Sequence, residues 1–380
     1  MNTCTEEFAR LTAPLQGLQC DGSPLVTFRN PFTLQHWTFP VIELLLIVGA
    51  AAGLVHAVKW YRAHGDSSNL VVWISLVSAL AIVEPITYFP QWFGLENTMG
   101  LVFAHGQFSI QFLYDRLPLY IVAMYPVYGY LAYVLVQRTG IFRKYNAFVG
   151  AVCVAFTFLA FFEIVDMVGP QFRWWVWNRE VASANPAIGP IPYASLQTFS
   201  LVIPFAVTFI VLLLKRRPRA GWLGVVRNVI IVSLGVWPLM MVGTLLTLAG
   251  SLVTSQENAR MVFTWLFILG SLAITAYAFA GAYRARRQDP QLIPDGVGRD
   301  YFAAVSAVVY LVFCVVFWVA ALPDYLAARD GVTPAGDPIA SLPFALAAFA
   351  SAIALLFGAY AGTTAPSAVA SSSVPLTPTA

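Results

Sequence analysis

Charged side chains are scarce in this sequence. Only 10% of its 380 residues are Asp, Glu, Lys or Arg, whereas 59% are hydrophobic. A soluble globular chain carries about 25% charged residues, and so little charge would leave large apolar patches exposed to water. The near balance of 21 basic and 18 acidic residues, with no basic stripe, argues against a nucleic-acid partner. The composition therefore predicts a chain whose main solvent is membrane lipid.

Several motifs that would name a chemistry are also missing. The sequence has no phosphate-binding loop, no dinucleotide fingerprint and no serine-nucleophile elbow. Its four histidines stand alone, without the paired spacing that binds a metal on a helix. We therefore expect neither a metal nor another cofactor. Among the four cysteines, Cys4 and Cys20 precede the first apolar run and are candidates for a disulfide, with two free thiols as the alternative.

Long apolar runs are what the sequence has in abundance. A membrane-spanning helix needs about 20 mostly apolar residues, and strands would leave backbone groups unpaired in lipid. Nine segments qualify, namely residues 40–61, 70–90, 118–137, 146–168, 193–214, 222–250, 261–283, 301–322 and 341–361. We predict an all-α bundle of about nine transmembrane helices over residues 40–361. An N-terminal segment (1–39) precedes it, and a disordered tail rich in Ser, Thr, Pro and Ala (362–380) follows.

Basic residues concentrate in the loops that follow the first, third, fifth and seventh spans. Because positive charge gathers on the cytoplasmic side of a cell membrane, the N-terminus is predicted outside and the C-terminus inside. Two long, aromatic-rich loops, residues 91–117 and 169–192, then lie outside with the N-terminal segment. Such loops usually lie on the membrane surface or fold back over a site.

Carboxyl groups gather near the outer ends of the spans in this orientation. They are Glu43, Glu84, Asp115, Glu163 and Asp166. Glu84 precedes Pro85, which removes one helical hydrogen bond and often shapes a cavity. Glu163 and Asp166 are three residues apart and share a helix face. An ionisable group in a span is costly and is a functional hypothesis by default, although Glu43 has the simpler interpretation of a side chain that snorkels.

An acid–base site is predicted from three of these carboxyls. Two carboxyls in a low-dielectric site titrate apart, so one serves as an acid and the other as a base. We expect Glu84 to fill one role and Glu163 with Asp166 to fill the other. Asp115 is a further catalytic candidate, and His105, in the first long loop, is a candidate proton carrier.

Aromatic and polar residues next to these acids form the predicted substrate-binding set. They are Tyr88, Trp92, Asn97, Arg173, Trp174, Trp175, Trp177 and Asn178. Aromatic rings can stabilise a developing carbocation or oxocarbenium ion by cation–π attraction. Alternatively, the tryptophans form an interfacial belt and Arg173 only neutralises Asp166. By the same reasoning, Arg116 neutralises Asp115.

The stretch EPITYFPQWFGLENTMG, residues 84–100, carries a family resemblance. Its acid–proline pair, followed by Trp92, Phe93 and Asn97, resembles a pattern in the AveC-like spirocyclase membrane proteins of actinobacteria. The stretches LPLYIVAMYPVYGYLAYV and FFEIVDMVGPQFRWWVWN occupy the positions of that family's next two spans. The resemblance covers about residues 40–215.

A weaker resemblance links the chain to the integral membrane carotenoid hydratases. It rests on Asp166, on Trp175 with Trp177, and on Gly189 with Pro190 or Pro192. The asparagine expected in that pattern is replaced by Ser195 or Gln197. Both resemblances imply proton-dependent chemistry without a cofactor on a lipophilic polyketide or isoprenoid, such as spiroketal formation, dehydration or hydration.

Three functional hypotheses follow from the sequence. The leading one is a membrane enzyme that performs acid–base chemistry on a lipophilic small molecule. The second is a proton-coupled transporter, since intramembrane acids serve transporters equally well, although no inverted repeat is evident. The third is a non-catalytic membrane protein whose aromatic loops dock a partner. The sequence does not indicate an oligomeric state.

Overall fold

The computed structural model describes residues 3–15, 22–214, 221–289, 292–293 and 300–361. In this part of the chain, nine helices are long and apolar enough to cross a membrane. They are α2 (Thr38–His64), α3 (Ser68–Tyr88), α4 (Leu119–Arg138), α6 (Ala147–Val168), the continuous helix α7–η6–α8 (Tyr193–Leu214), α9 (Trp222–Gly250), α10 (Gln256–Gln288), α11 (Phe302–Ala327) and α12 (Leu342–Tyr360). The predicted all-α bundle is confirmed, with span bounds that differ by a few residues.

Local signals set several of these helix ends. Asn146 caps α6, because its side chain accepts a hydrogen bond from the backbone N–H of Val149. Helix α2 ends before Gly65, which adopts a left-handed conformation with φ of 64° that glycine reaches without strain. Pro85 lies inside α3, one residue after Glu84, and the helix continues through it to Tyr88.

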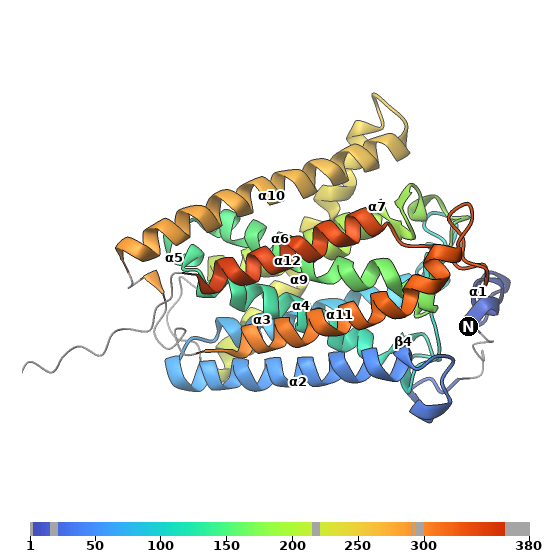
Figure 1. Cartoon of the computed structure of the whole chain (residues 1–380), viewed down its shortest axis with the longest axis horizontal. Helices are drawn as coiled ribbons and strands as arrows, with labels where there is room; N and C mark the ends of the chain where they lie inside the picture. Colours follow the sequence, from blue (N-terminus) through green and yellow to red (C-terminus); the bar gives the residue numbers. More distant parts are fainter. Residues whose placement is uncertain (1–2, 16–21, 215–220, 290–291, 294–299, 362–380) are drawn as a thin grey trace, which may run out of the picture.

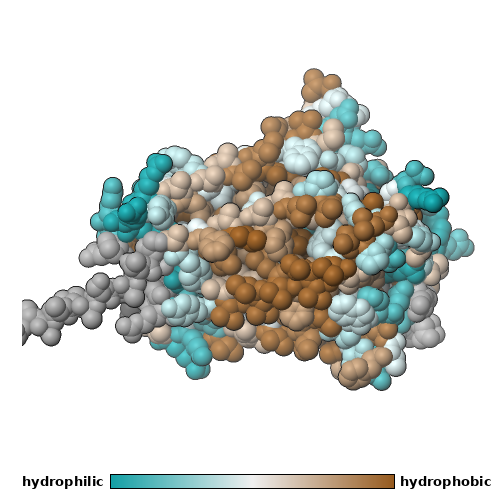
Figure 2. Space-filling model, in the orientation of Figure 1, coloured by the Kyte–Doolittle hydropathy of each residue, from teal (hydrophilic) through white to brown (hydrophobic). Residues whose placement is uncertain are grey.

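An apolar band crosses the outer surface of the bundle. Figure 2 shows hydrophobic residues across the middle of the visible face and hydrophilic residues toward both ends. Exposed side chains such as Leu234 and Leu245 on α9 and Val312 and Val319 on α11 contribute to the apolar surface. Apolar surface of this kind between two polar ends indicates a multi-pass membrane protein.

Helices α4 and α6 form the centre of the bundle. In the most apolar stretch of each helix, 83% of the residues of α4 and 89% of those of α6 are buried, compared with 22% in α9 and 28% in α10. The remaining spans pack around them, in the order α2, α3, α9, α10, α12 and α11, with α8 wedged between α6 and α9. Side chains on the inner faces of α4 and α6 are therefore shielded from lipid.

A folded cap covers one end of the bundle, called the capped end here and seen at the right of Figure 1. The two long loops pair there, because β2 (Phe103–His105) runs antiparallel to β5 (Trp175–Trp177). Strands β1 (Val26–Phe28), β3 (Ile110–Phe112) and β4 (Leu117–Pro118) form a second sheet, and β6 (Ala187–Ile188) pairs with β7 (Ile191–Pro192). Helix α1 (Glu6–Thr12) packs on β2. The predicted long loops thus fold back over the bundle.

One carboxyl group fastens the cap to a span, and a second joins two segments within the cap. Glu43, buried near the start of α2, accepts hydrogen bonds from the backbone N–H groups of Ser109 and Ile110 at 3.0 and 3.2 Å. Asp115 forms an ion pair with Arg29. Cys4 is disulfide-bonded, and its predicted partner Cys20 lies outside the described residues, as does the predicted tail 362–380.

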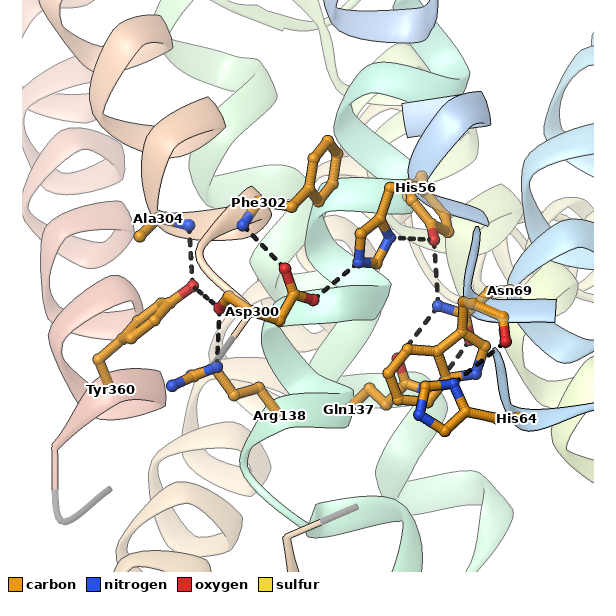
Figure 3. A network of polar contacts seen from close by, with 11 residues as sticks. His56, His64, Asn69, Gln137, Arg138, Asp300, Phe302, Ala304 and Tyr360 are labelled. Atoms are coloured by element: carbon orange, nitrogen blue, oxygen red, sulfur yellow. Dashed lines mark hydrogen bonds and ion pairs between the residues drawn. The ribbon is translucent and has the colours of Figure 1, made fainter. Parts of the chain in front are cut away.

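The opposite end, called the basic end, is joined by a polar network that Figure 3 shows in close-up. Asp300, between α10 and α11, pairs with His56 of α2 at 2.7 Å. His56 in turn contacts the Tyr130 hydroxyl of α4 at 2.6 Å, and Asn69 of α3 donates to the same hydroxyl. His56 therefore ties three spans to the α10–α11 connection.

Candidate functional site

A cavity lined by two carboxyl groups lies beneath the β2–β5 pair. Glu84 of α3 and Asp166 of α6 both line it, together with His105 of β2. Rings make up most of the remaining wall, from Phe103, Tyr125, Phe162, Trp175, Trp177 and Phe199. The space open to the centre of a water molecule is about 40 Å³, whereas one water needs roughly 10–15 Å³. We call this site the acid cavity.

Glu84 reaches the cavity from the last turn of α3 and is only 3% exposed. Thr87 donates to the Glu84 backbone carbonyl at 2.8 Å and approaches its carboxyl at 3.3 Å. Tyr88 lies four residues further along, on the same face of α3. Because Pro85 cannot donate to the carbonyl four residues earlier, this turn is held by side chains as well as by the backbone. The Glu84 carboxyl is therefore fixed toward the bundle interior.

Asp166 and Glu163 form a second acidic position on α6. Asp166 is 3% exposed, and Glu163, one turn earlier, is fully buried. Glu163 accepts a hydrogen bond from the Ser200 hydroxyl at 2.5 Å. One oxygen of each carboxyl, Oε2 of Glu163 and Oδ2 of Asp166, has no hydrogen-bond partner among the described residues. Most buried polar atoms in proteins are paired, so two orphaned carboxyl oxygens here require an explanation.

His105 joins two tyrosines at the edge of the cavity. Its Nε2 lies 3.0 Å from the Tyr88 hydroxyl and its Nδ1 lies 3.1 Å from the Tyr120 hydroxyl. Burial lowers the pKa of His105 to about 3, against the opposing effect of the Trp174 backbone carbonyl. The ring is therefore neutral at physiological pH, with one donor and one acceptor nitrogen. It therefore holds the hydroxyls of Tyr88 and Tyr120 beside the cavity.

Cations lie outside the cavity wall. Arg116 donates to the Tyr88 backbone carbonyl at 2.5 Å and stacks over the ring of Phe89, so it fixes the end of α3 from behind. Burial lowers the pKa of Arg116 to about 10, which leaves it charged at neutral pH. Arg173 pairs with Asp337 at 2.7 Å. The expected pairs Arg116–Asp115 and Arg173–Asp166 are replaced by these contacts.

The structure brings together only part of the predicted site. Five predicted residues line the acid cavity, namely Glu84, His105, Asp166, Trp175 and Trp177. Tyr88 touches this set through its hydrogen bond with His105. Glu163 interacts electrostatically with Asp166. The central expectation, that Glu84 and Asp166 meet beneath the capped end, agrees with this geometry.

The other predicted residues serve the cap rather than the cavity. Trp92 stacks on Phe89 with ring centroids 3.9 Å apart, and Asn97 is exposed. Asn178 donates to Glu7 and to the Leu101 carbonyl. Two further predicted residues, Asp115 and Trp174, are held by Arg29 and by the Thr38 hydroxyl, and neither lines the cavity.

Several cavity residues were missed from the sequence. Helix α4 contributes three of them to the wall, namely Ile121, Met124 and Tyr125. Their spacing of three and four residues places them on one helix face, and this spacing could have indicated a shared surface. Ser195 and Phe199 line it from the span Tyr193–Leu214. Residues 196–202 of that span form a π-helix, for which the sequence carries no recognisable marker.

Comparison with known proteins gives a family but no activity. Within the described part of the chain, no group of three His, Cys, Asp or Glu side chains is placed to hold a metal. The model of a family described as a domain of unknown function, DUF7802, matches residues 28–328. The chain belongs to the DUF7802 family. No curated protein and no solved structure matches it. The DUF7802 match contains every residue that lines the acid cavity and excludes α1 and α12.

Proposed function

We propose that this chain is a multi-pass membrane enzyme that performs acid–base chemistry on a lipophilic small molecule. The observation that carries the proposal is the meeting of two buried carboxyls, Glu84 and Asp166, from different helices in one aromatic cavity whose described wall residues include no lysine or arginine. Two carboxyls that share a desolvated site do not both ionise readily, and one shared proton gives an acid and a base. The resemblance to AveC-like spirocyclases supports the same chemistry.

Such a pair can carry out dehydration. The protonated carboxyl donates its proton to a substrate hydroxyl, and the C–O bond breaks with its electron pair leaving as water. The second carboxylate removes a proton from the neighbouring carbon, and the C–H electron pair forms the double bond. In ring closure the same C–O bond breaks and water leaves, but a second hydroxyl of the substrate attacks the carbon that lost it. The carboxylate takes the proton of this attacking hydroxyl, whose oxygen forms the new C–O bond. Neither reaction changes the oxidation state of the substrate.

The surrounding rings and hydrogen bonds support these roles. Trp175 and Trp177 line the same cavity as the carboxyls and can stabilise positive charge that develops on carbon. Neutral His105 holds the hydroxyl of Tyr88, and Thr87 approaches the Glu84 carboxyl at 3.3 Å. We place the capped end on the outer side of the cell membrane, because basic residues favour the other end. The substrate then enters from the outer leaflet.

Replacement of Glu84 tests the proposal. In a host strain that lacks its own copy of the gene, lipid extracts are compared by mass spectrometry with and without the wild-type chain. We expect the wild type to convert one lipophilic compound into its isomer or into a product that differs by one water, and Glu84→Gln to lose this conversion. Glu96→Gln, on an exposed acid in the same loop region, is the control.

Two results would overturn the enzymatic proposal. Normal conversion by a stably expressed Glu84→Gln chain would remove Glu84 from the reaction. A chain that changes only the distribution of a compound between cells and medium, and not its chemical identity, would instead be a transporter.

A further inference from the structure

A second, larger cavity opens in the membrane-facing part of the bundle. It lies between α6, the span Tyr193–Leu214, α9 and α10, and its volume in the same measure as above is about 350 Å³. Its walls are apolar, with Phe148, Val152, Phe205, Leu239 and Phe267 among them. Ser271 is its one hydroxyl-bearing wall residue, and that hydroxyl donates to its own helix. We call this cavity the tail groove.

The tail groove and the acid cavity follow one face of α6. Val152 and Ala155 line the groove, and Phe162 and Asp166 line the acid cavity. Steps of three, seven and four residues keep these side chains on the same side of a helix. From Ala155 to Asp166 is eleven residues, or about 16 Å along the axis. A molecule that lies along this face would thus meet hydrocarbon walls first and carboxyls last.

The facing helix shows the same succession. Phe199 lines the acid cavity, whereas Val202, less than one turn further, lines the groove. Both residues belong to the π-helical segment Leu196–Val202, and such segments inside α-helices are frequent at functional sites. Ser200 of the same segment holds Glu163, and Gln197 donates to the backbone carbonyl of Gly243 on α9 at 3.3 Å. The π-helical segment therefore lines both cavities.

The groove opens sideways between α9 and α10, which runs along the upper edge of the bundle in Figure 1. Val242 of α9 is 49% exposed and Leu266 of α10 is 57% exposed, although both line the groove. In a membrane-spanning bundle this opening faces the hydrocarbon of the lipid. An apolar chain can therefore enter without crossing water.

The acid cavity restricts the chemistry of what reaches it. Among the described residues, its wall carries two carboxyls and no cationic side chain, so a phosphate or carboxylate head would meet only like or neutral groups there. The orphaned oxygen of Asp166 favours a head that donates a hydrogen bond. A neutral hydroxyl satisfies both conditions.

We propose that the tail groove and the acid cavity together bind one amphiphile, whose single long hydrocarbon chain lies in the groove and whose neutral hydroxyl end meets Asp166. This inference deepens the proposed function by naming the substrate class as a long-chain alcohol. Binding along this path does not itself depend on catalysis.

Photolabelling tests the groove directly. The full chain in lipid nanodiscs is incubated with hexadecanol that carries a diazirine in mid-chain, irradiated, digested and mapped by mass spectrometry. We expect labelled peptides from the groove-lining parts of α9 and α10. Gly270→Leu should lose most of this labelling, because a side chain at Gly270 points into open space and would fill the groove. Ala276→Leu, on an exposed position of α10 outside the groove wall, should keep it.

Competition and a second variant separate the parts of the inference. Excess unlabelled hexadecanol should suppress labelling, whereas hexadecyl phosphate should not, and equal suppression by both would overturn the neutral head. Equal labelling of Gly270→Leu and wild type, or labelling spread evenly over the lipid-facing helices, would overturn the claim that the hydrocarbon chain lies in the groove.

Glu84→Gln should still be labelled. Labelling of the groove without any conversion by the wild type would refute the proposed reaction alone, and conversion without labelling would refute the groove alone.

Discussion

Asp300 at the basic end and the two carboxyl groups of α6 at the capped end differ in how their oxygens are paired. At the basic end, Asp300 has a partner for each carboxyl oxygen, with His56 at 2.7 Å and the backbone N–H of Phe302 at 2.9 Å. At the capped end, Glu163 and Asp166 each keep one oxygen without a partner among the described residues. An unpaired buried polar atom costs about 1–3 kcal/mol, so a fold gains nothing from it. The difference separates a carboxyl that holds helices together from carboxyls available to a ligand.

The charge on Asp300 fits its structural role. Burial raises the pKa of Asp300, but the hydrogen bond and charge of His56, the Phe302 N–H and the charge of Arg138 outweigh it and hold the pKa below its usual value. The carboxylate therefore stabilises the fold at neutral pH, and that contribution is lost only as the pH falls through its lowered pKa. The network of Figure 3 thus closes the basic end while the acid cavity stays chemically open.

The same substitution at both ends should give opposite results, and the largest effect is expected at Asp166. Asp166→Asn keeps the shape of the side chain but removes its acid–base function, so conversion of the substrate should fall by about 100-fold or more. Because Asp166 has an unpaired oxygen, thermal unfolding in detergent should stay unchanged or shift upward. Conversion is measured in lipid extracts and stability by melting. A large loss of stability without loss of conversion would erase the distinction between the two ends.

Asp300→Asn is the matched change at the basic end. It removes the charge that pairs with His56, and we expect a loss of about 1–3 kcal/mol in the free energy of unfolding, less than for a fully buried pair because both partners are partly exposed. Conversion per folded molecule should be unchanged. Asp324→Asn, at an exposed position of α11, is the control and should unfold like the wild type. An Asp300→Asn chain that melts normally would show that the network is dispensable.

A third, smaller effect concerns pH and His105. Its pKa is lowered to about 3 in the folded chain, whereas an exposed histidine titrates near 6.5. Below about pH 6.5 the unfolded chain binds a proton that the folded chain does not. The free energy of unfolding therefore decreases by about 1.4 kcal/mol for each unit by which the pH is lowered. Between pH 7 and 5 this contribution reaches about 2 kcal/mol. His105→Gln should flatten the melting profile over this range, and His36→Gln, whose pKa is also lowered but which is only half-buried, should flatten it less.

The sequence predicted the spans and the deepest acids because those features depend on local chemistry. Each span is an apolar run that suffices by itself to define a helix, and Glu84 and Asp166 stand out because carboxyls are rare in such runs. Their approach to one cavity followed from placing both near the same end of the bundle. These steps needed no knowledge of which helices touch.

The rest of the site depends on contacts between distant segments. The register of β2 against β5 pairs His105 with Trp175 across 70 positions of the chain, and nothing local encodes it. Asp115 was assigned to Arg116 by proximity in sequence, yet Arg29 is its partner in space. Asp300 was overlooked because an acid in a connecting segment carries no sign of burial. Tertiary packing, rather than residue type, decided each of these outcomes.

The smallest effect in the comparison is expected from Ser200→Ala. The Ser200 hydroxyl is the one hydrogen-bond donor that Glu163 has among the described residues, at 2.5 Å. Its removal leaves the carboxyl beside Asp166 without that donor, and losing one such bond, worth about 1 kcal/mol, should lower conversion by roughly fivefold. Ser200→Thr keeps a hydroxyl and should restore most of the conversion, which a purely steric role of Ser200 would not allow. Ser78→Ala, which removes a hydroxyl from the α3–α9 contact, is the control. If Ser200→Ala converts substrate like the wild type, Glu163 lies outside the reaction. Glu84 and Asp166 are then the two carboxyls that carry it.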